Sequence, residues 1–473
     1  MMLFIPVPLM LPRRCEFIRT LVNPPNLFKK RANKFAPTSC IALLTLLLTA
    51  SHAHALTLAE AIALAQRNDP TYLASQANVQ VNRARADQAF SRRLPQLTAS
   101  FNNNSNQRDY TALGNRPNPV SERYNSRATQ LNLTQPLLHV DKIIAQHQAD
   151  SQVSQAEYQQ LAAEKNLLLR LAQAWLETLY AQTAILAADS KVRTSQQEME
   201  LSQKATDQGV MSITERETAQ MRHAQAFAEQ TAAQNEYELK LATLEQIIGT
   251  DEPPHASALS DHLLTLAPTP LADWLAQAEQ NNPTVLAAQR ALEVAEQEVH
   301  KHRAGHLPTL DLVASRSLST QGSGITGGGA GFHSSIDSLG IQLNIPLYSG
   351  GEQNAKIGEA HALRDKARYE LDAARRTSRL NIKQAWHNWQ SAHARQQSGK
   401  QTLQATEFAL QAATAQRTHG LKADLDVLQA QQQRAEAQRD WHKARTEILL
   451  GYLKLKAETG ELTDEDVAGM VGK

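Results

Sequence analysis

The sequence predicts an α+β membrane protein that is built as a tandem internal repeat. Three observations lead to this fold class: the chain has long stretches without Gly or Pro, it has four short stretches in which apolar and polar residues alternate, and most of its motifs occur twice at an almost constant spacing. Aromatic residues account for only 5% of the 473 residues, which favours long, closely packed helices over a compact core.

The N-terminal segment differs from the rest of the chain. Basic residues between positions 29 and 34 precede the apolar run IALLTLLLTA at 41–50, and the small-residue sequence AHA follows it. A basic region, a short apolar region and a small-residue cleavage site are typical of a secretory signal peptide. The apolar run is about half as long as the roughly 20 residues that a membrane-spanning helix needs. We therefore expect residues 1–55 to be a signal peptide with an upstream segment, and the mature chain to begin near Leu56.

The predicted signal segment has a net positive charge and contains both cysteines. It contains seven Lys+Arg and one Glu, a charge of +6, so the full chain's +1 leaves a mature chain of about −5. This charge argues against a nucleic-acid-binding surface. Because Cys15 and Cys40 both lie in the segment, we expect no disulfide and no cysteine metal site in the mature chain. Beyond the segment, no run of 18 apolar residues predicts a transmembrane helix.

The remainder of the chain is duplicated. Motif pairs recur 211 to 213 residues apart. They are NDPTYLASQ at Asn68 and NNPTVLAAQ at Asn281, LPQL at Leu94 and LPTL at Leu307, Ala174-Trp175 and Ala385-Trp386, and Gly209 and Gly420. Chance matches do not keep one register, so we expect a first repeat over 56–256 and a second over 257–473.

Both repeats predict the same elements. A short helix ends at the Asn-Pro motif, because Asn and Pro mark where one helix stops and another starts. A second helix, two strands, a long helix, a glycine turn and a return helix follow. In the first repeat we expect a helix at Thr71–Arg93, a β-hairpin at 95–135 with strands Pro95–Phe101 and Thr129–Gln135, and a helical hairpin at 142–248. In the second we expect a helix at Thr284–Ala304, a β-hairpin at 308–345 with strands Pro308–Arg316 and Leu339–Ile345, and a helical hairpin at 351–458.

The predicted lengths indicate how the helices pack. A long helix of some 65 residues reaches on the order of 100 Å, and a return helix of some 37 residues about 55 Å. The helix before the first strand adds roughly 35 Å. The two shorter helices, placed end to end, therefore nearly match the long one, and we expect them to lie alongside it.

The four strands alternate between an apolar and a polar side. In the first strand, Leu97, Ala99 and Phe101 lie on one side, and polar residues lie on the other. A wall between lipid and water needs this pattern. Four strands cannot close a barrel, because the smallest has eight, and an open sheet edge is costly in lipid. If the strands lie in a membrane, several chains must share one barrel.

The signal peptide, the duplicated NDP/NNP and LPxL motifs, the strand end QLNIPLYSGG, and the tips QGVMSITERETAQ and HGLKADLDVLQAQ together resemble the TolC family. These are outer-membrane efflux and type I secretion channels, and the resemblance covers about residues 56–460. It implies a homotrimer with a 12-stranded β-barrel in outer-membrane lipid and a long α-helical coiled-coil barrel in the periplasm. It also implies docking to a periplasmic adaptor and an inner-membrane transporter, of the ABC type or another, and it implies no catalytic residues, cofactor or metal.

The resemblance also implies two sets of site residues. In the family, a polar network between helices holds the periplasmic end closed. Here Glu215 and Lys422 take the acid and base positions, Arg417 stands where an aromatic hydroxyl is usual, and Gln429 replaces the second acid of a ring at the narrowest point. The implied gate residues are Asp426, Asp424, Glu215, Thr214, Lys422 and Arg417, and the implied adaptor-docking tips are Gly209, Val210, Gly420 and Leu421. The alternative for any one of them is an ordinary surface charge on a solvated hairpin.

Other functions and motifs fit less well. A periplasmic adaptor protein is the main alternative to a channel, but the duplication and the alternating strands argue against it. The GxGxxG at 322–331 precedes a strand, whereas a nucleotide site needs a helix there, so we expect a surface loop. His302 and His306 are spaced like helix metal ligands but lack a third ligand. The mature chain has no G-x-S-x-G or H-E-x-x-H motif of a hydrolase. Within the family, the lack of a lipid-anchor cysteine favours protein secretion.

Overall fold

The computed structural model describes residues 56–111, 119–250, 259, 270–323, 330–419 and 423–470. These residues belong to one compact unit. The expected signal peptide lies outside them, and so do the expected tip residues Gly420 and Leu421 and the expected gate residue Lys422. Within the described residues, no helix has the length and apolar character to cross a membrane.

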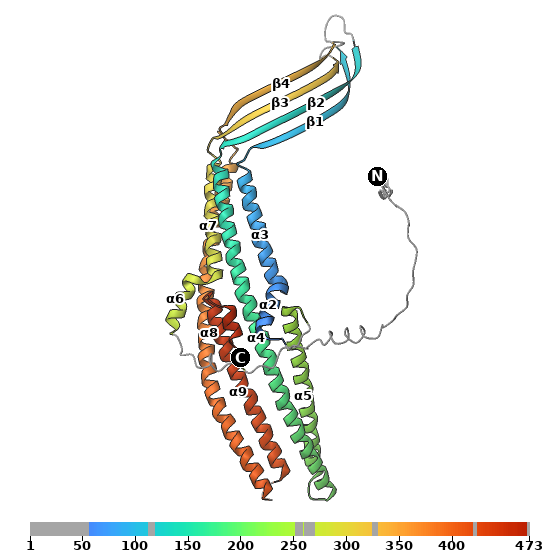
Figure 1. Ribbon diagram of the computed structural model, residues 1–473, viewed down its shortest axis with the longest axis vertical. Helices are drawn as coiled ribbons and strands as arrows, with labels where there is room; N and C mark the ends of the chain where they lie inside the picture. Colours follow the sequence, from blue (N-terminus) through green and yellow to red (C-terminus); the bar gives the residue numbers. More distant parts are fainter. Residues whose placement is uncertain are drawn as a thin grey trace, which may run out of the picture. The chain divides into compact units, whose positions relative to one another are not determined.

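The two repeats have the same order of elements (Figure 1). The first consists of α2 (Leu58–Asn68), α3 (Pro70–Ser91), β1 (Gln96–Thr111), β2 (Pro119–Leu138), α4 (Val140–Asp207) and α5 (Ile213–Ile248). The second consists of α6 (Leu271–Asn281), α7 (Pro283–Ala304), β3 (Thr309–Ser323), β4 (Ala330–Asn344), α8 (Glu352–Thr418) and α9 (Asp424–Glu458), and α10 (Asp464–Ala468) follows. The long helices α4 and α8 contain 68 and 67 residues, close to the predicted length.

The Asn-Pro motifs start new helices as predicted. Asp69 caps α3 by accepting a hydrogen bond from the backbone N–H of Tyr72 at 2.8 Å. Asn282 caps α7 in the same way, through the N–H groups of Thr284 and Val285. A proline follows each cap at the first helical position, where its missing N–H costs nothing.

The strands form one antiparallel sheet in the order β1-β2-β3-β4 (Figure 1). The two repeats therefore join through the pairing of β2 with β3, and β1 and β4 are the edge strands of the sheet within one chain. One register row crosses all four strands. That row consists of Leu97, Leu133, Ala314 and Leu339.

The strands are longer than the alternating stretches predicted. β1 continues from Phe101 to Thr111, and β2 begins at Pro119 instead of Thr129. In these extensions both sides of the strand are polar, so no apolar alternation marked them as strand. β2 also passes Pro136, where the prediction ended it, because a register shift between Pro136 and Leu138 accommodates a residue that cannot donate to the ladder.

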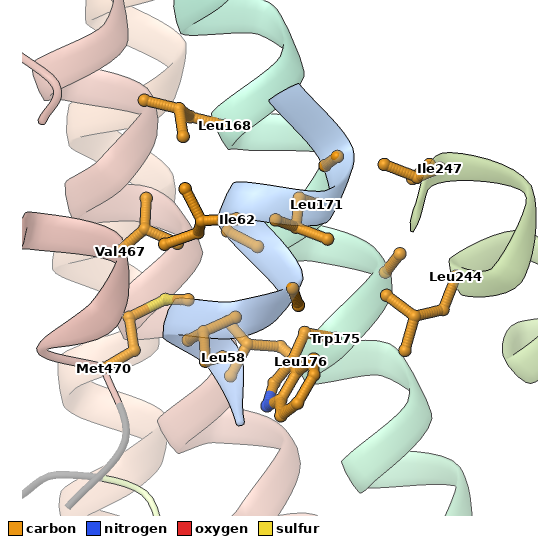
Figure 2. Close-up of a cluster of buried hydrophobic side chains, with 14 of the residues drawn as sticks. Leu58, Ile62, Leu168, Leu171, Trp175, Leu176, Leu244, Ile247, Val467 and Met470 are labelled. Atoms are coloured by element: carbon orange, nitrogen blue, oxygen red, sulfur yellow. The ribbon is translucent and has the colours of Figure 1, made fainter. Parts of the chain in front are cut away.

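The helix α4 lies at the centre of the helical packing. It packs against α3 and α5 of its own repeat and against α7 and α9 of the other. Near its middle, Trp175, Leu171 and Leu176 are fully buried in an apolar cluster with side chains of α2 and α5 (Figure 2). A second cluster around Trp274 and Trp389 joins α6, α8 and α9.

The short helix α10 was not predicted. Its Val467 and the following Met470 are fully buried against Leu58 and Ile62 of α2 (Figure 2). Asp466 accepts a hydrogen bond from Lys456 of α9 and forms an ion pair with it. This contact holds α10 against α9. Three acidic residues in five are typical of an exposed tail. Only the tertiary contacts show that this segment packs against the apolar core.

The two repeats differ in charge where their short helices meet. In the first repeat, Arg170 donates to Asp69 at 3.1 Å. Burial alone would raise the pKa of Asp69, but hydrogen bonds from Thr71, Tyr72 and Arg170 outweigh it and lower the pKa. In the second repeat the acid lies on the return helix. Glu458 accepts hydrogen bonds from Asn282 and Asn381, which occupy the positions equivalent to Asp69 and Arg170.

Burial raises the pKa of Glu458 in spite of the two amide donors. An acid with a raised pKa in the folded state binds its proton more tightly there than in the unfolded chain. We therefore predict that Glu458 favours folding at low pH, and that this contribution is lost as the pH rises above the ordinary value of 4.5 toward the raised one.

Glu458→Gln should reduce this pH dependence, because the amide cannot ionise. Thermal unfolding at pH 5 and pH 8 should show a smaller loss of stability with pH in the variant than in the wild type. Glu461→Gln, at an exposed position three residues after Glu458, is the matched control and should behave like the wild type. Equal pH dependence in Glu458→Gln and the wild type contradicts the prediction.

Candidate functional site at the helical hairpin tips

The turn between α4 and α5 presents an apolar tip. Gly209 has a φ of 71°, in the left-handed region that glycine enters without strain. The N–H groups of Gly209 and Val210 bond back to the last turn of α4 at 2.9 Å each, which ends the helix. Val210 is 81% exposed and Ile213 is 66% exposed, so two large apolar side chains project into solvent at the tip. Exposed apolar side chains of this kind suit contact with another protein.

The expected gate acid Glu215 caps the start of α5. Its Oε2 accepts hydrogen bonds from the Ser212 hydroxyl at 2.8 Å and from the Ser212 N–H at 3.0 Å. The Ser212 hydroxyl in turn accepts from the Glu215 N–H. The bond to the backbone N–H is the largest of the contributions that lower the pKa of Glu215. Thr214, its expected hydroxyl neighbour, is exposed.

Asp426 has the same role on the return helix of the second repeat. It lies 211 residues after Glu215, and its carboxylate accepts a hydrogen bond from the N–H of Ala423 at 3.0 Å. Asp424, two residues earlier at the start of α9, forms an ion pair with Arg417 in the last turn of α8. These capping roles were not predicted, although the S-x-x-E spacing at Ser212 is a capping-box signal.

The two hairpins contact each other close to their tips. Gln429 of α9 donates a hydrogen bond to Glu198 of α4 at 3.0 Å. The Thr194 hydroxyl donates to the carbonyl of Leu428 at 3.1 Å. The amide at Gln429, which departs from the expected acid, therefore joins the hairpins in one chain. Glu198 was not singled out from the sequence, because no motif surrounds it.

Other candidate chemistry finds no support in the described part of the chain. No group of three His, Cys, Asp or Glu residues there could hold a metal ion. His302 instead lies 2.9 Å from Glu298, one turn earlier on α7. The predicted GxGxxG loop lies partly outside the described residues, and its flanks Gly322 and Gly331 belong to β3 and β4.

Known proteins match both repeats. A family model described as outer membrane efflux protein matches residues 61–250 and 274–461. The alkaline protease secretion protein AprF of Pseudomonas aeruginosa is 28% identical over 89% of this chain and 88% of its own length. The proteases secretion protein PrtF of Dickeya chrysanthemi is 26% identical over 90% of this chain and 93% of its own. The Campylobacter jejuni CmeC outer membrane channel has a similar fold, with a TM-score of 0.69, 15% identity, and coverage of 94% of this chain and 95% of that one.

A substitution can test the capping role of Glu215 separately from its expected role in the gate. Glu215→Ala removes the acceptor of two hydrogen bonds, and losing a cap costs about 1 kcal/mol. Amide hydrogen exchange in the first turn of α5 should therefore accelerate about fivefold. The control is Glu217→Ala, because Glu217 pairs only with its neighbour Arg216 among the described residues. Unchanged exchange in Glu215→Ala, or equal acceleration in both variants, contradicts this role.

Proposed function

This chain belongs to the outer membrane efflux protein family, and from that premise we propose how its copies build a channel. It is an outer-membrane channel that exports substrates, with a helical extension in the periplasm, and the adaptor alternative is not favoured. We propose a homotrimer in which three four-stranded sheets form one 12-stranded barrel and the helices form a tunnel. The main support for this homotrimer is that one side of α8 is exposed in the single chain.

The long helices α4 and α8 bury equivalent stripes against their own repeats. Several residues of α8 are buried at positions 211 residues after buried residues of α4. The pairs are Ala149 and Ala360, Ala156 and Ala367, Leu171 and Ile382, and Ala181 and Ala392.

On α4, but not on α8, a second side of the helix is covered by helices of the other repeat. Gln148 of α4 is buried under Glu298 of α7, and Thr194 is buried under Leu428 of α9. Ala187 between them is buried as well. The equivalent residues of α8 are exposed. They are Glu359, Ala405 and Ser398.

The repeat equivalence supports α3 and α5 of a second copy as the helices that cover this side of α8. Since α7 and α9 correspond to α3 and α5, the side of α8 is suited to α3 and α5 of a second copy. All three helices carry large exposed apolar side chains, whereas α7 and α9 expose none of this size. These side chains are Leu73, Val81 and Phe90 on α3, Met221, Phe227 and Leu239 on α5, and Leu363, Tyr369, Leu380 and Phe408 on α8. Contact between copies would remove this apolar surface from water.

The sheet supports the same arrangement. Among the described residues of one chain, β1 and β4 each pair with a strand on one edge only, and strand edges in lipid must be paired. The resemblance to the TolC family implies three copies. Their 12 strands are more than the eight strands of the smallest barrels. The apolar side, with Leu97 and Leu339 at 70% and 76% exposure, then contacts lipid.

The partners and cargo follow from the tips and the relatives. We propose that Gly209, Val210, Gly420 and Leu421 dock onto a periplasmic adaptor, which joins the channel to an inner-membrane transporter. The exposed apolar tip at Val210 supports this contact. The names of AprF and PrtF support a secreted protein as cargo. At the gate, three copies of Asp426 line the narrowest point, and Asp424, Glu215, Thr214, Lys422 and Arg417 hold the hairpins in the closed position.

Ala405→Trp tests the contact between copies. Its equivalent Thr194 is buried, so a large ring at Ala405 should clash with α5 of the second copy at a cost of about 1–3 kcal/mol. We predict at least about fivefold less oligomer at equal expression, measured by light scattering in detergent. The control Gln404→Trp adds the same ring one residue earlier, where the equivalent Arg193 is exposed, and should assemble normally. Normal assembly of Ala405→Trp contradicts the proposed interface.

Conductance in planar bilayers tests the channel and its gate. Three carboxylates around a narrow axis attract cations, so the wild type should be cation-selective. Asp426→Asn removes the charge but keeps an oxygen that can cap α9, and should lower the cation-to-anion permeability ratio severalfold. Asp424→Asn is the matched control and should change this ratio less. Selectivity lost in the control but kept in Asp426→Asn would mean that the ring is formed by the other residue, and a wild type without conductance would overturn the channel.

A further inference from the structure

The apolar side of the sheet ends at a defined row. Leu97, Leu133, Ala314 and Leu339 form one row across the four strands. Toward the loops between paired strands, the last row on this side with large apolar residues contains Phe101 of β1 and Leu318 of β3. In the proposed channel this side contacts lipid, and the loops lie at the cell exterior, opposite the periplasmic helices.

The next row on the same side consists of hydrogen-bonding residues. It lies two residues further along each strand, about 7 Å beyond the apolar row. We call it the donor row, and it consists of Asn103, Arg127, Thr320 and His333. Asn103, Arg127 and His333 are exposed, and Thr320 is half-buried.

The donor row carries a positive charge that no described acid neutralises. The Nε of Arg127 donates to the amide oxygen of Asn103 at 3.4 Å, a neutral partner. The Thr320 hydroxyl and His333 Nδ1 lie 2.8 Å apart. The nearest acid on this side, Asp337, lies two rows away and pairs with Arg316 at 3.6 Å. Among the described residues, both Nη groups of Arg127 therefore remain available.

The opposite side of the sheet provides a contrast. There Arg108 is paired with Glu122 on the neighbouring strand, and both side chains are largely buried. On the apolar side, Arg123 lies two rows beyond Arg127 and donates to the amide oxygen of Gln107. Asp109, on the row after Arg123, is the outermost acid on this side. Arg127, at the edge of the apolar surface, therefore lies further from an acid on its own side of the sheet than either Arg316 or Arg123 does.

We propose that the donor row binds the phosphate group of a lipid headgroup in the outer leaflet. This inference rests on the proposed function, which places the apolar side in lipid. A guanidinium, a hydroxyl and an imidazole match the oxygens of a phosphate, and arginine binds such groups through paired N–H donors. The adjoining apolar rows hold the acyl chains of the same molecule, so one lipid contacts both surfaces.

The test measures binding of lipid A, a phosphorylated glycolipid, and of its dephosphorylated form to the assembled protein in detergent. Native mass spectrometry counts the lipids that remain bound. Arg127→Gln should weaken lipid A binding about fivefold, since one basic residue near an anionic surface contributes roughly this factor. Arg127→Lys should retain most of the binding, and dephosphorylated lipid A should bind weakly and equally to all forms.

The matched control is Arg92→Gln. Arg92 is exposed at the end of α3, before β1, and so lies beyond the other end of the apolar surface. This variant has the same net charge as Arg127→Gln and should bind lipid A like the wild type. Undiminished binding in Arg127→Gln, or an equal loss in both variants, overturns the proposal. If the variants still form conducting oligomers in that case, only the lipid site fails. If the wild type forms no such oligomer, the proposed function fails.

Discussion

The architecture depends on a narrow buried stripe along the long helices. On α8, the buried residues Leu371, Ser378, Ala385 and Ala392 are spaced seven apart. A seven-residue repeat keeps one side of a helix against its neighbour and winds the helices into a left-handed supercoil. Most of these side chains are small, and small side chains at a contact allow two helices to approach closely. Few large residues are then needed, which explains the low aromatic content.

The sequence predicted the elements whose signals repeat. The constant spacing between motif pairs placed the long helices and the glycine turn at Gly209 to within a few residues, because a signal that occurs twice is hard to misread. It did not predict the outer half of each strand. The Asn102–Asn106 run resembles a loop, and its strand conformation depends on pairing with β2 and not on local preference. Contacts between distant segments, such as Glu198 with Gln429, have no local signal at all.

The tips show why site residues are harder to read than the fold. Glu215 and Asp426 were singled out by their resemblance to gate positions, and both cap a return helix in the structure. A carboxylate at the third position of a helix is a common structural feature, so the same residue serves the helix end whether or not it also faces a lumen. The capping-box spacing at Ser212 was visible in the sequence. A contact between a proposed gate residue and another copy of the chain has no such signal in the sequence.

The pairing of β2 with β3 joins the sheets of the two repeats, and in the described part of the chain it leaves one edge of β1 and one edge of β4 without a partner strand. The edge strands β1 and β4 have 16 and 15 residues, which is long for edges that carry free N–H and C=O groups. In the proposed oligomer these edges pair between copies, so a copy that has not yet assembled carries a surface on which foreign strands can add. The proposed assembly therefore has to be fast compared with encounters with other unfolded chains.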